Sequence, residues 1–400
     1  MYQQGRLAES PLLVLSYEGI RLRKNDRTRA GMDEGQPIQY DCRMNLKEIA
    51  SLRLVNQQIA KTKFTSPREL VAWMGAMQAQ DALMVKWAVG VRLPNATEKD
   101  VEAALDRGEI LRTHVLRPTW HIVSADDLRW MLSLTAPRIQ AGMKSRHSEL
   151  GLDVGMLSKS RKVIEKTLRG GRHATRETLI RALEQAGIAT DENRASHLFA
   201  AAELEGLICS GKTQQGKQTF ALLEEWVQPS PPIERDEALA RLAKRYFTSH
   251  GPATLEDFTW WSGLTVSDAR RALESVKAEL QSETVEEKIY WFTAMRVQPK
   301  ETAFLLPAFD EFLISYKDRS ATITLAHQRR AFTSNGIFHP VIVVDGRAVG
   351  VWKRTLKRDQ VQVQAEYFVP ITPAAQKQIE AQALRYGGFL GKAPALTIKA

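Results

Sequence analysis

The sequence predicts a mainly helical α+β protein, and three observations lead to this fold class. Three stretches in succession show apolar residues at helical spacing and then close with paired, strand-like segments. The segment Gln228–Pro232 holds three prolines, which cannot continue a helix, and it therefore indicates a linker between units. Residues 299–400 alternate apolar and polar positions, which indicates a C-terminal α+β or partial-barrel domain.

Residues 1–43 show no sustained apolar period, so we expect a poorly ordered N-terminal extension. The first unit occupies residues 44–150. Its helices are expected near 46–60, 67–77, 82–92 and 97–107. Two alternating segments, 110–116 and 119–123, predict a strand pair joined by Arg117-Pro118.

The second unit, residues 151–230, has the clearest pattern. Its helices are expected at 157–169, 175–186 and 193–205, and its strands at 207–210 and 219–223. The connection between the strands, 211–217, is basic and bears glycine, as a wing does. Three helices followed by a wing are the winged-helix variant of the helix-turn-helix, and we predict this fold for the unit.

The third unit, residues 231–298, repeats the arrangement. A helix at 235–249 precedes a second one, Ser262-Gly263 makes a turn into a third, and residues 281–292 suit a short wing. The predicted domains are therefore an extension at 1–43, winged-helix units at 44–150, 151–230 and 231–298, and an α+β domain at 299–400.

In the last domain the alternation predicts strands at 303–306, 341–344, 348–352 and 361–365. Asp345-Gly346 is a strong signal for a tight hairpin turn. We expect a helix at Pro373–Tyr386 to close the chain.

The charge balance indicates a polyanionic partner, because 56 Lys and Arg stand against 46 Asp and Glu. The only cysteines, Cys42 and Cys209, exclude a disulfide framework and a four-cysteine metal cluster, and fit a reducing cytoplasm. No apolar run reaches the roughly 18 residues that a membrane helix needs. Three unlike units without apolar heptads predict a monomer, and we expect it in the cytoplasm with the nucleoid.

The stretch with the most chemical interest is Gln78-Ala79-Gln80-Asp81, at the end of an expected helix. Residues two apart point to nearly opposite sides of a helix but share a face of an extended segment. If Gln78 and Gln80 act together, this segment must therefore leave the helix. By itself the pattern is more typical of a polar loop between helices.

The chain from about residue 44 onward resembles the AlkZ/YcaQ group of winged-helix DNA glycosylases. The motifs that carry the resemblance are Gln78–Asp81, Leu116–His121, Trp130–Leu132, Ala136–Arg138, Trp260–Leu264, Leu306–Phe312, Asp318-Arg319, Gly346-Arg347 and Gly350–Trp352. The resemblance implies three tandem winged helices that form a concave surface, and monofunctional removal of alkylated bases. It also implies that Gln78 and Gln80 are the catalytic residues. Because the YcaQ-like branch has aspartate at the second position, the two glutamines match the AlkZ-like branch. Members of the AlkZ-like branch unhook interstrand crosslinks.

The physical chemistry of the two amides is compatible with that role. A glutamine is a poor general base, but its carbonyl can orient a water molecule beside developing positive charge. Such an apparatus suffices when the leaving group is already activated, as in a purine alkylated at N7 or N3. We therefore expect duplex DNA with alkylated purines as the partner, and no cofactor or metal.

Further residues are candidates for supporting roles. Asp81 directly follows Gln80, and Arg117 and His121 lie on or beside the expected strand pair. Asp81 also suits a helix cap, and His121 suits either contact with a phosphate or the lesion, or a structural hydrogen bond. The expected DNA contacts are Lys144, Arg146, Arg172, His173, Arg176, Lys212 and Lys217. Acidic residues around Asp310 and Glu311 are interpreted as parts of internal salt bridges. The alternative function is a non-enzymatic winged-helix DNA-binding protein or transcription regulator, which would usually be a two-fold dimer.

Overall fold

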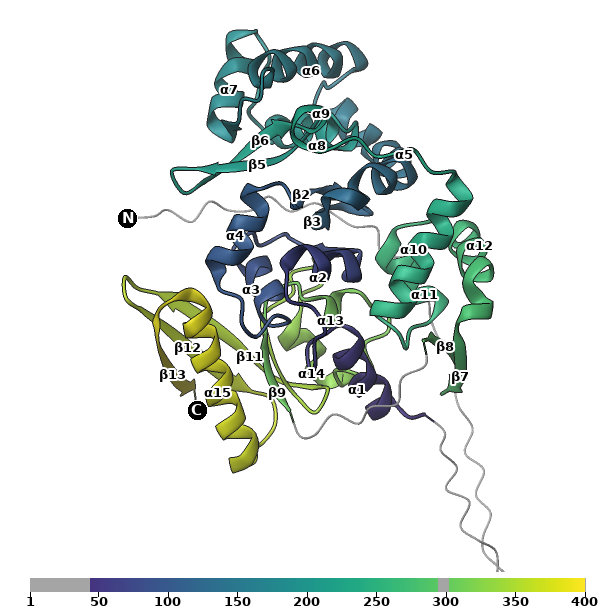
Figure 1. Ribbon diagram of the computed structural model, residues 1–400, viewed down its shortest axis with the longest axis vertical. Coiled ribbons are helices and arrows are strands. Elements are labelled where there is room, and N and C mark those ends of the chain that lie inside the picture. The colour runs from purple at the N-terminus through teal and green to yellow at the C-terminus, as the bar shows by residue number, and fades with distance from the viewer. Residues whose placement is uncertain (1–43, 294–301, 400) are drawn as a thin grey trace, which may run out of the picture.

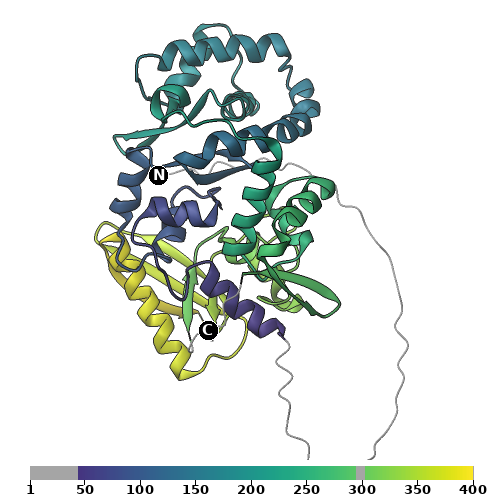
Figure 2. The ribbon, with the colours of Figure 1, turned by 45° about the vertical axis from the view of Figure 1, so that its right-hand side comes forward.

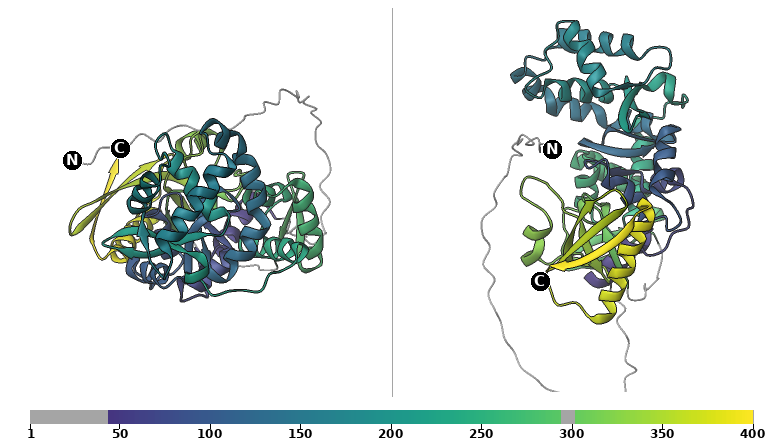
Figure 3. Two further views of the ribbon diagram at one scale, coloured as in Figure 1. Left: turned by 90° about the horizontal axis from the view of Figure 1, so that it is seen from above. Right: turned by 90° about the vertical axis from the view of Figure 1, so that its left-hand side faces the viewer.

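The computed structural model describes residues 44–293 and 302–399, so the predicted extension at 1–43 lies outside the described residues. The described chain combines helices with small sheets, and its second unit stands at one end of the molecule (Figures 1 and 2). A side view shows the same unit set apart from the C-terminal sheet (Figure 3).

The first unit begins with α1 (Leu46–Asn56), whose cap Asn45 accepts hydrogen bonds from the N–H groups of Lys47 and Glu48. The next elements are α2 (Pro67–Met74), β1 (Ala76–Gln78), α3 (Met84–Gly90), α4 (Glu98–Asp106), β2 (Ile110–Val115) and β3 (Arg117–Ser124). The strands form an antiparallel sheet in the order β1-β3-β2. The long helix α5 (Ala125–Glu149) then leads to the second unit.

The second unit repeats this order of elements. They are α6 (Val154–Leu168), β4 (Ala174–Thr175), α7 (Arg176–Gln185), α8 (Arg194–Leu204), β5 (Ile208–Gln214) and β6 (Lys217–Leu222), followed by the short α9 (Leu223–Trp226). The sheet order is β4-β6-β5, so β4, which lies between α6 and α7, pairs with the last strand, as β1 between α2 and α3 does in the first unit.

The third unit follows the same order in reduced form. Its elements are α10 (Arg235–Ser249), α11 (Leu255–Ser262), α12 (Val266–Val276), the 3-10 turn η1 (Lys277–Glu279), β7 (Gln281–Val285) and β8 (Lys288–Phe292). In place of a first strand, Ala253 makes a single bridge to Trp291 in β8. Each unit therefore places a strand or bridge residue beside the last strand of its hairpin.

The C-terminal region forms a five-stranded sheet in the order β13-β12-β11-β10-β9. Its elements are β9 (Ala303–Leu306), α13 (Glu311–Ile314), α14 (Leu325–Ala331), β10 (Val341–Val344), β11 (Arg347–Leu356), β12 (Gln360–Tyr367), α15 (Pro373–Leu390) and β13 (Ala393–Lys399). Asp345 and Gly346 both have positive φ, as a tight turn between β10 and β11 requires.

The prediction that a helix closes the chain is wrong. Helix α15 runs on to Leu390, Gly391 ends it with φ 63°, and β13 then pairs in parallel with β12. A local pattern could not reveal this strand, because a parallel pair has no connecting turn to mark it.

The apolar cores cross the boundaries between units. The first unit and the C-terminal sheet share one core, in which Trp87 of α3 donates to the carbonyl oxygen of Leu305 over 2.7 Å. A second core joins the other face of the first sheet to α5 and the third unit. The first sheet is thus held between two cores.

Candidate active site

The glutamine motif leaves the helix, as a joint role for its two side chains requires. We expected a helix over residues 67–77, but α2 ends at Met74 because Gly75 takes a φ of 78°. Residues with a side chain rarely adopt this conformation, so the glycine marks the change from helix to strand. Strand β1 follows at once, and Gln78 lies opposite His121 of β3.

Gln78 lies in β1, and Gln80 lies two residues further on, in a bend just after the strand. The N–H of Ala79 donates to the carbonyl oxygen of Trp120 over 2.7 Å, so the pairing with β3 continues past Gln78. Met77 and Ala79 are buried in the core shared with the C-terminal sheet, whereas Ala76 is buried in the other core. By alternation, Gln78 belongs to the face of Ala76. Gln78 is 6% exposed and Gln80 is exposed, which places the pair across the boundary with solvent.

Arg117 fixes the side chain of Gln78. Its Nη2 donates to Oε1 of Gln78 over 2.8 Å. Because a guanidinium has only donors, the atom that faces it must be the amide oxygen. Burial lowers the pKa of Arg117, and the charge of Glu311 opposes that effect.

His121 lies below the surface of the site. It is fully buried, and its Nδ1 lies 3.0 Å from the carbonyl oxygen of Thr119, to which it must donate. Burial and the charge of Arg117 lower its pKa to about 3, so the ring is neutral at physiological pH. Within the described residues, its Nε2 and the Oγ1 of Thr113 on the paired strand have no hydrogen-bond partner. His121 therefore suits the support of the site better than contact with a phosphate.

Asp81 acts as a helix cap. Its Oδ1 accepts from the N–H groups of Leu83 and Met84, each over 2.9 Å. Helix α3 begins at Met84, two residues later than we expected. The carboxylate is thus engaged with the first turn of α3, in agreement with the capping interpretation.

Two further residues contact the motif, and no local feature of the sequence indicates either role. Glu311, from the C-terminal region, accepts from the N–H of Gln78 over 2.5 Å. Arg112 of β2 donates from Nε to the carbonyl oxygen of Ala79, between the glutamines, over 2.9 Å. Asp310 forms the internal ion pair that we expected, with Arg92 at 2.8 Å, whereas Glu311 contacts the motif itself.

The β5–β6 hairpin contacts the first unit beside this site. The N–H of Arg112 donates to Oγ of Ser210 in β5 over 2.8 Å, and the N–H of Thr213 donates to Asp106 over 2.7 Å. Arg112 therefore connects the hairpin to the segment between the glutamines.

The predicted DNA contacts differ in how available their charges are. Lys212 and Lys217 are exposed near the hairpin tip, Lys144 is exposed on α5, and none of the three has an ion-pair partner among the described residues. Arg146 pairs with Glu149 at 2.8 Å. The N–H of Lys212 donates to Nδ1 of His173 over 2.9 Å, so the structure brings these two candidates together.

The remaining two arginines, Arg172 and Arg176, form contacts within the second unit. Arg172 donates to the carbonyl oxygens of Arg169 and Lys166 at the end of α6. Arg176 donates to Ser196 over 3.0 Å and lies 4.9 Å from the ring centre of Phe199.

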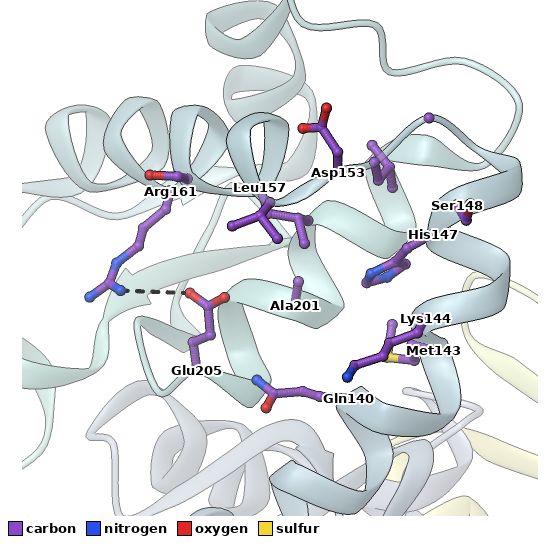
Figure 4. A pocket seen from close by; sticks show the side chains of 14 residues that line it. Gln140, Met143, Lys144, His147, Ser148, Asp153, Leu157, Arg161, Ala201 and Glu205 are labelled. Carbon is purple, nitrogen blue, oxygen red and sulfur yellow. Dashed lines mark ion pairs between the residues drawn. The ribbon is translucent and has the colours of Figure 1, made fainter.

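A cavity of about 670 Å³ lies elsewhere, between α5, α6 and α8 (Figure 4). Lys144 and His147 line one side, and Arg161 and Glu205, with a 3.8 Å ion pair, line another. The glutamine motif does not contribute to this cavity.

The described residues contain no group of three or more His, Cys, Asp or Glu side chains that could hold a metal ion. In the same part of the chain, no helix combines the length and the apolar character that crossing a membrane requires.

Comparisons with known proteins agree with the fold. A family model described as "DNA glycosylase AlkZ-like" matches residues 71–389. An interstrand DNA cross-link repair glycosylase from Streptomyces sahachiroi is 24% identical over 327 residues, which are 77% of this chain and 87% of that protein. The solved structure of the Streptomyces sahachiroi DNA glycosylase AlkZ has a TM-score of 0.73 and 21% identity, and the match covers 89% of this chain and 100% of that chain. The predicted mixture of helices and sheets is thereby confirmed.

Proposed function

The chain belongs to the AlkZ-like DNA glycosylase family, and from this premise we propose that it hydrolyses the N-glycosidic bond of cationic N-alkylated purines in duplex DNA. In this proposal Gln78 and Gln80 position the attacking water. The enzyme is monofunctional, acts as a monomer without a cofactor, and leaves an abasic site.

The chemistry that the two amides offer determines the substrate class. Hydrolysis of an N-glycosidic bond develops positive charge on the sugar and needs a placed water molecule. Neutral amides stabilise that charge less than a carboxylate does, so the leaving group has to carry its own activation. A purine alkylated at N7 or N3 is cationic and departs as a neutral base, whereas a normal purine does not.

The observation that carries the proposal is that the chain leaves the helix before the motif, so that Gln78 lies in a strand and Gln80 lies at the surface two residues later. Gln78 is held by Arg117 and Glu311, and Gln80 is exposed to solvent. In this proposal the attacking water binds between the fixed amide and the exposed one.

We propose that the three repeated units are winged helices, with boundaries at residues 44–150, 151–230 and 231–298, and that a concave surface formed by them binds the duplex. Their common element order supports this assignment, as does the pairing of each hairpin with β1, β4 or the bridge residue Ala253, each of which lies between two helices of its unit. The exposed lysines of the β5–β6 hairpin, linked to the motif through Arg112, suit contact with phosphates near the lesion.

A second substrate class is an interstrand crosslink between alkylated purines. The Streptomyces sahachiroi relative, which covers most of this chain, is named for the repair of such crosslinks. The same water-directed attack would unhook one strand. Family membership does not favour the alternative of a transcription regulator.

The test is excision of N7-methylguanine and unhooking of a nitrogen-mustard crosslink in duplex DNA. Gln78→Ala and Gln80→Ala should each lose about 2–3 kcal/mol of transition-state stabilisation while the DNA affinity persists. If the wild-type protein binds DNA but acts on neither substrate, the proposed activity is wrong.

A further inference from the structure

We infer that Glu311 is a positioning residue for this reaction, because its buried carboxylate holds the main chain of Gln78 and balances the charge of Arg117 across that residue. The inference rests on the proposed function of Gln78. It assigns a role in the active site to a residue of the C-terminal region.

The carboxylate of Glu311 collects donors from three parts of the fold. Its Oε1 accepts from the N–H of Gln78 over 2.5 Å, and its Oε2 accepts from Nε1 of Trp261 in α11 over 3.1 Å and from Oγ of Ser315. Nε2 of His250 lies 3.5 Å from the same oxygen. Glu311 is 1% exposed, so its place is set by these contacts rather than by solvent.

These contacts tie the third unit and the C-terminal region to the strand that carries the motif. Water cannot replace a hydrogen bond at a site this buried, so the N–H of Gln78 has no alternative partner. A shift of Glu311 would therefore move the main chain of Gln78, and with it the amide that faces the substrate. Misplacement of a positioned group by a fraction of an ångström is enough to slow a reaction.

The negative charge of Glu311 also compensates the positive charge that Arg117 places beside the reacting centre. Arg117 donates to Oε1 of Gln78, so a full positive charge lies one side chain away from the reacting centre. That charge opposes the positive charge that develops on the sugar. Glu311 lies on the main-chain side of the same residue, and its pKa responds to Arg117. The charge of Glu311 therefore offsets the charge of Arg117 across Gln78.

Asp310 supplies a matched comparison next to Glu311. It is equally buried, and it forms two hydrogen bonds with Arg92, of 2.8 and 2.9 Å. It has no hydrogen bond to the glutamine motif among the described residues. Loss of its charge tests the stability of the same segment without direct contact with Gln78.

The experiment compares Glu311→Gln with Asp310→Asn. In Glu311→Gln the amide oxygen can still accept from the N–H of Gln78, and the amide nitrogen can donate to Ser315 or His250, but Nε1 of Trp261 loses its acceptor. This variant removes the charge and preserves most of the geometry; Glu311→Ala removes both. Single-turnover excision of N7-methylguanine, DNA affinity and melting temperature are measured for each protein.

We expect Glu311→Gln to slow excision by roughly tenfold or more while DNA affinity changes less than about twofold, and Glu311→Ala to be slower still. Asp310→Asn should lower the melting temperature without a comparable loss of rate below it. Because Glu311→Gln leaves Arg117 without its counter-charge, the double variant Arg117→Met/Glu311→Gln should be faster than the product of the two single effects predicts.

The inference is overturned if Glu311→Gln excises at the wild-type rate, or if its rate loss and melting temperature both match those of Asp310→Asn. Strictly multiplicative effects in the double variant would also overturn the role in charge balance. If the wild-type protein does not excise, the proposed function itself is refuted. If the wild-type protein excises and Glu311→Gln does so equally fast, only the role of Glu311 is refuted, so the two failures are distinguishable.

Discussion

The Nη2 of Arg117 and the Oε1 of Gln78 lie 2.8 Å apart, and this contact decides how the amide is presented. The oxygen is held toward the guanidinium, so the amide nitrogen points away from it. No hydrogen bond of that nitrogen is observed among the described residues. Gln78 therefore offers a donor, together with the second lone pair of its oxygen, where the sequence suggested an acceptor alone.

Removal of Arg117 should release this amide. We expect Arg117→Met to raise the activation free energy of single-turnover excision by about 1.5–3 kcal/mol, the range for loss of a hydrogen bond to a charged group. The measurement is excision of N7-methylguanine at saturating enzyme, with the melting temperature recorded in parallel. A wild-type rate in a stably folded Arg117→Met protein would show that the orientation of the amide does not matter.

The β5–β6 hairpin should contribute phosphate contacts. We expect Lys212→Ala combined with Lys217→Ala to weaken duplex binding and to reduce the slope of log K against log salt by about 2. The control removes the same charge from Lys47 of α1 and Lys377 of α15, which are exposed on helices away from the hairpin (Figure 1). Equal salt slopes in the wild type and the hairpin variant would remove the hairpin from the interface.

Gly263 should be required for close packing of the third unit on the site. It ends α11 with φ 67°, and a Cβ there would lie 2.4 Å from the carbonyl oxygen of Leu116, next to Arg117. Gly391 ends α15 with a similar φ of 63°, but no described atom lies within 4 Å of its Cβ position.

Alanine at these two glycines separates backbone strain from steric clash. We expect Gly391→Ala to reduce the free energy of unfolding by about 1–2 kcal/mol from strain alone. Gly263→Ala should reduce the free energy of unfolding by about 1–3 kcal/mol more than Gly391→Ala does, because Leu116 must move. It should also slow excision, because the neighbouring Arg117 is displaced. Urea unfolding measures both losses, and equal values would contradict the close contact.

The carboxyl of Glu311 should make the free energy of unfolding depend on pH in the acidic range. Burial alone would raise its pKa, but contacts with His250 and Ser315 and the charge of Arg117 lower it to about 2. In the unfolded chain its pKa is near 4.5. The unfolded state therefore binds more protons as the pH falls below 4.5, and the stability that this carboxylate contributes is lost between 4.5 and 2.

We expect the difference in unfolding free energy between wild type and Glu311→Gln to shrink by about 2 kcal/mol from about pH 6 to about pH 3. Urea unfolding at the two pH values measures this change. A constant difference would show that the carboxyl titrates alike in both states.

The sequence by itself predicted the order of helices and hairpins in the three repeated units, the turn at Asp345-Gly346 and the family. These features depend on apolar spacing, turn residues and short motifs, which act over a few neighbouring residues. The spacing of Gln78 and Gln80 also indicated that a joint role requires the segment to leave the helix, and Gly75 provides that break.

Only the tertiary structure decided what surrounds that pair. Glu311 meets Gln78 across 233 positions of sequence, Arg112 reaches Ala79 from another strand, and β13 pairs with β12 in parallel without a turn between them. Such contacts depend on how separate units pack against one another. No local pattern in the sequence indicates such contacts, because the two partners lie far apart in the chain and neither one determines the backbone conformation of the other's neighbours.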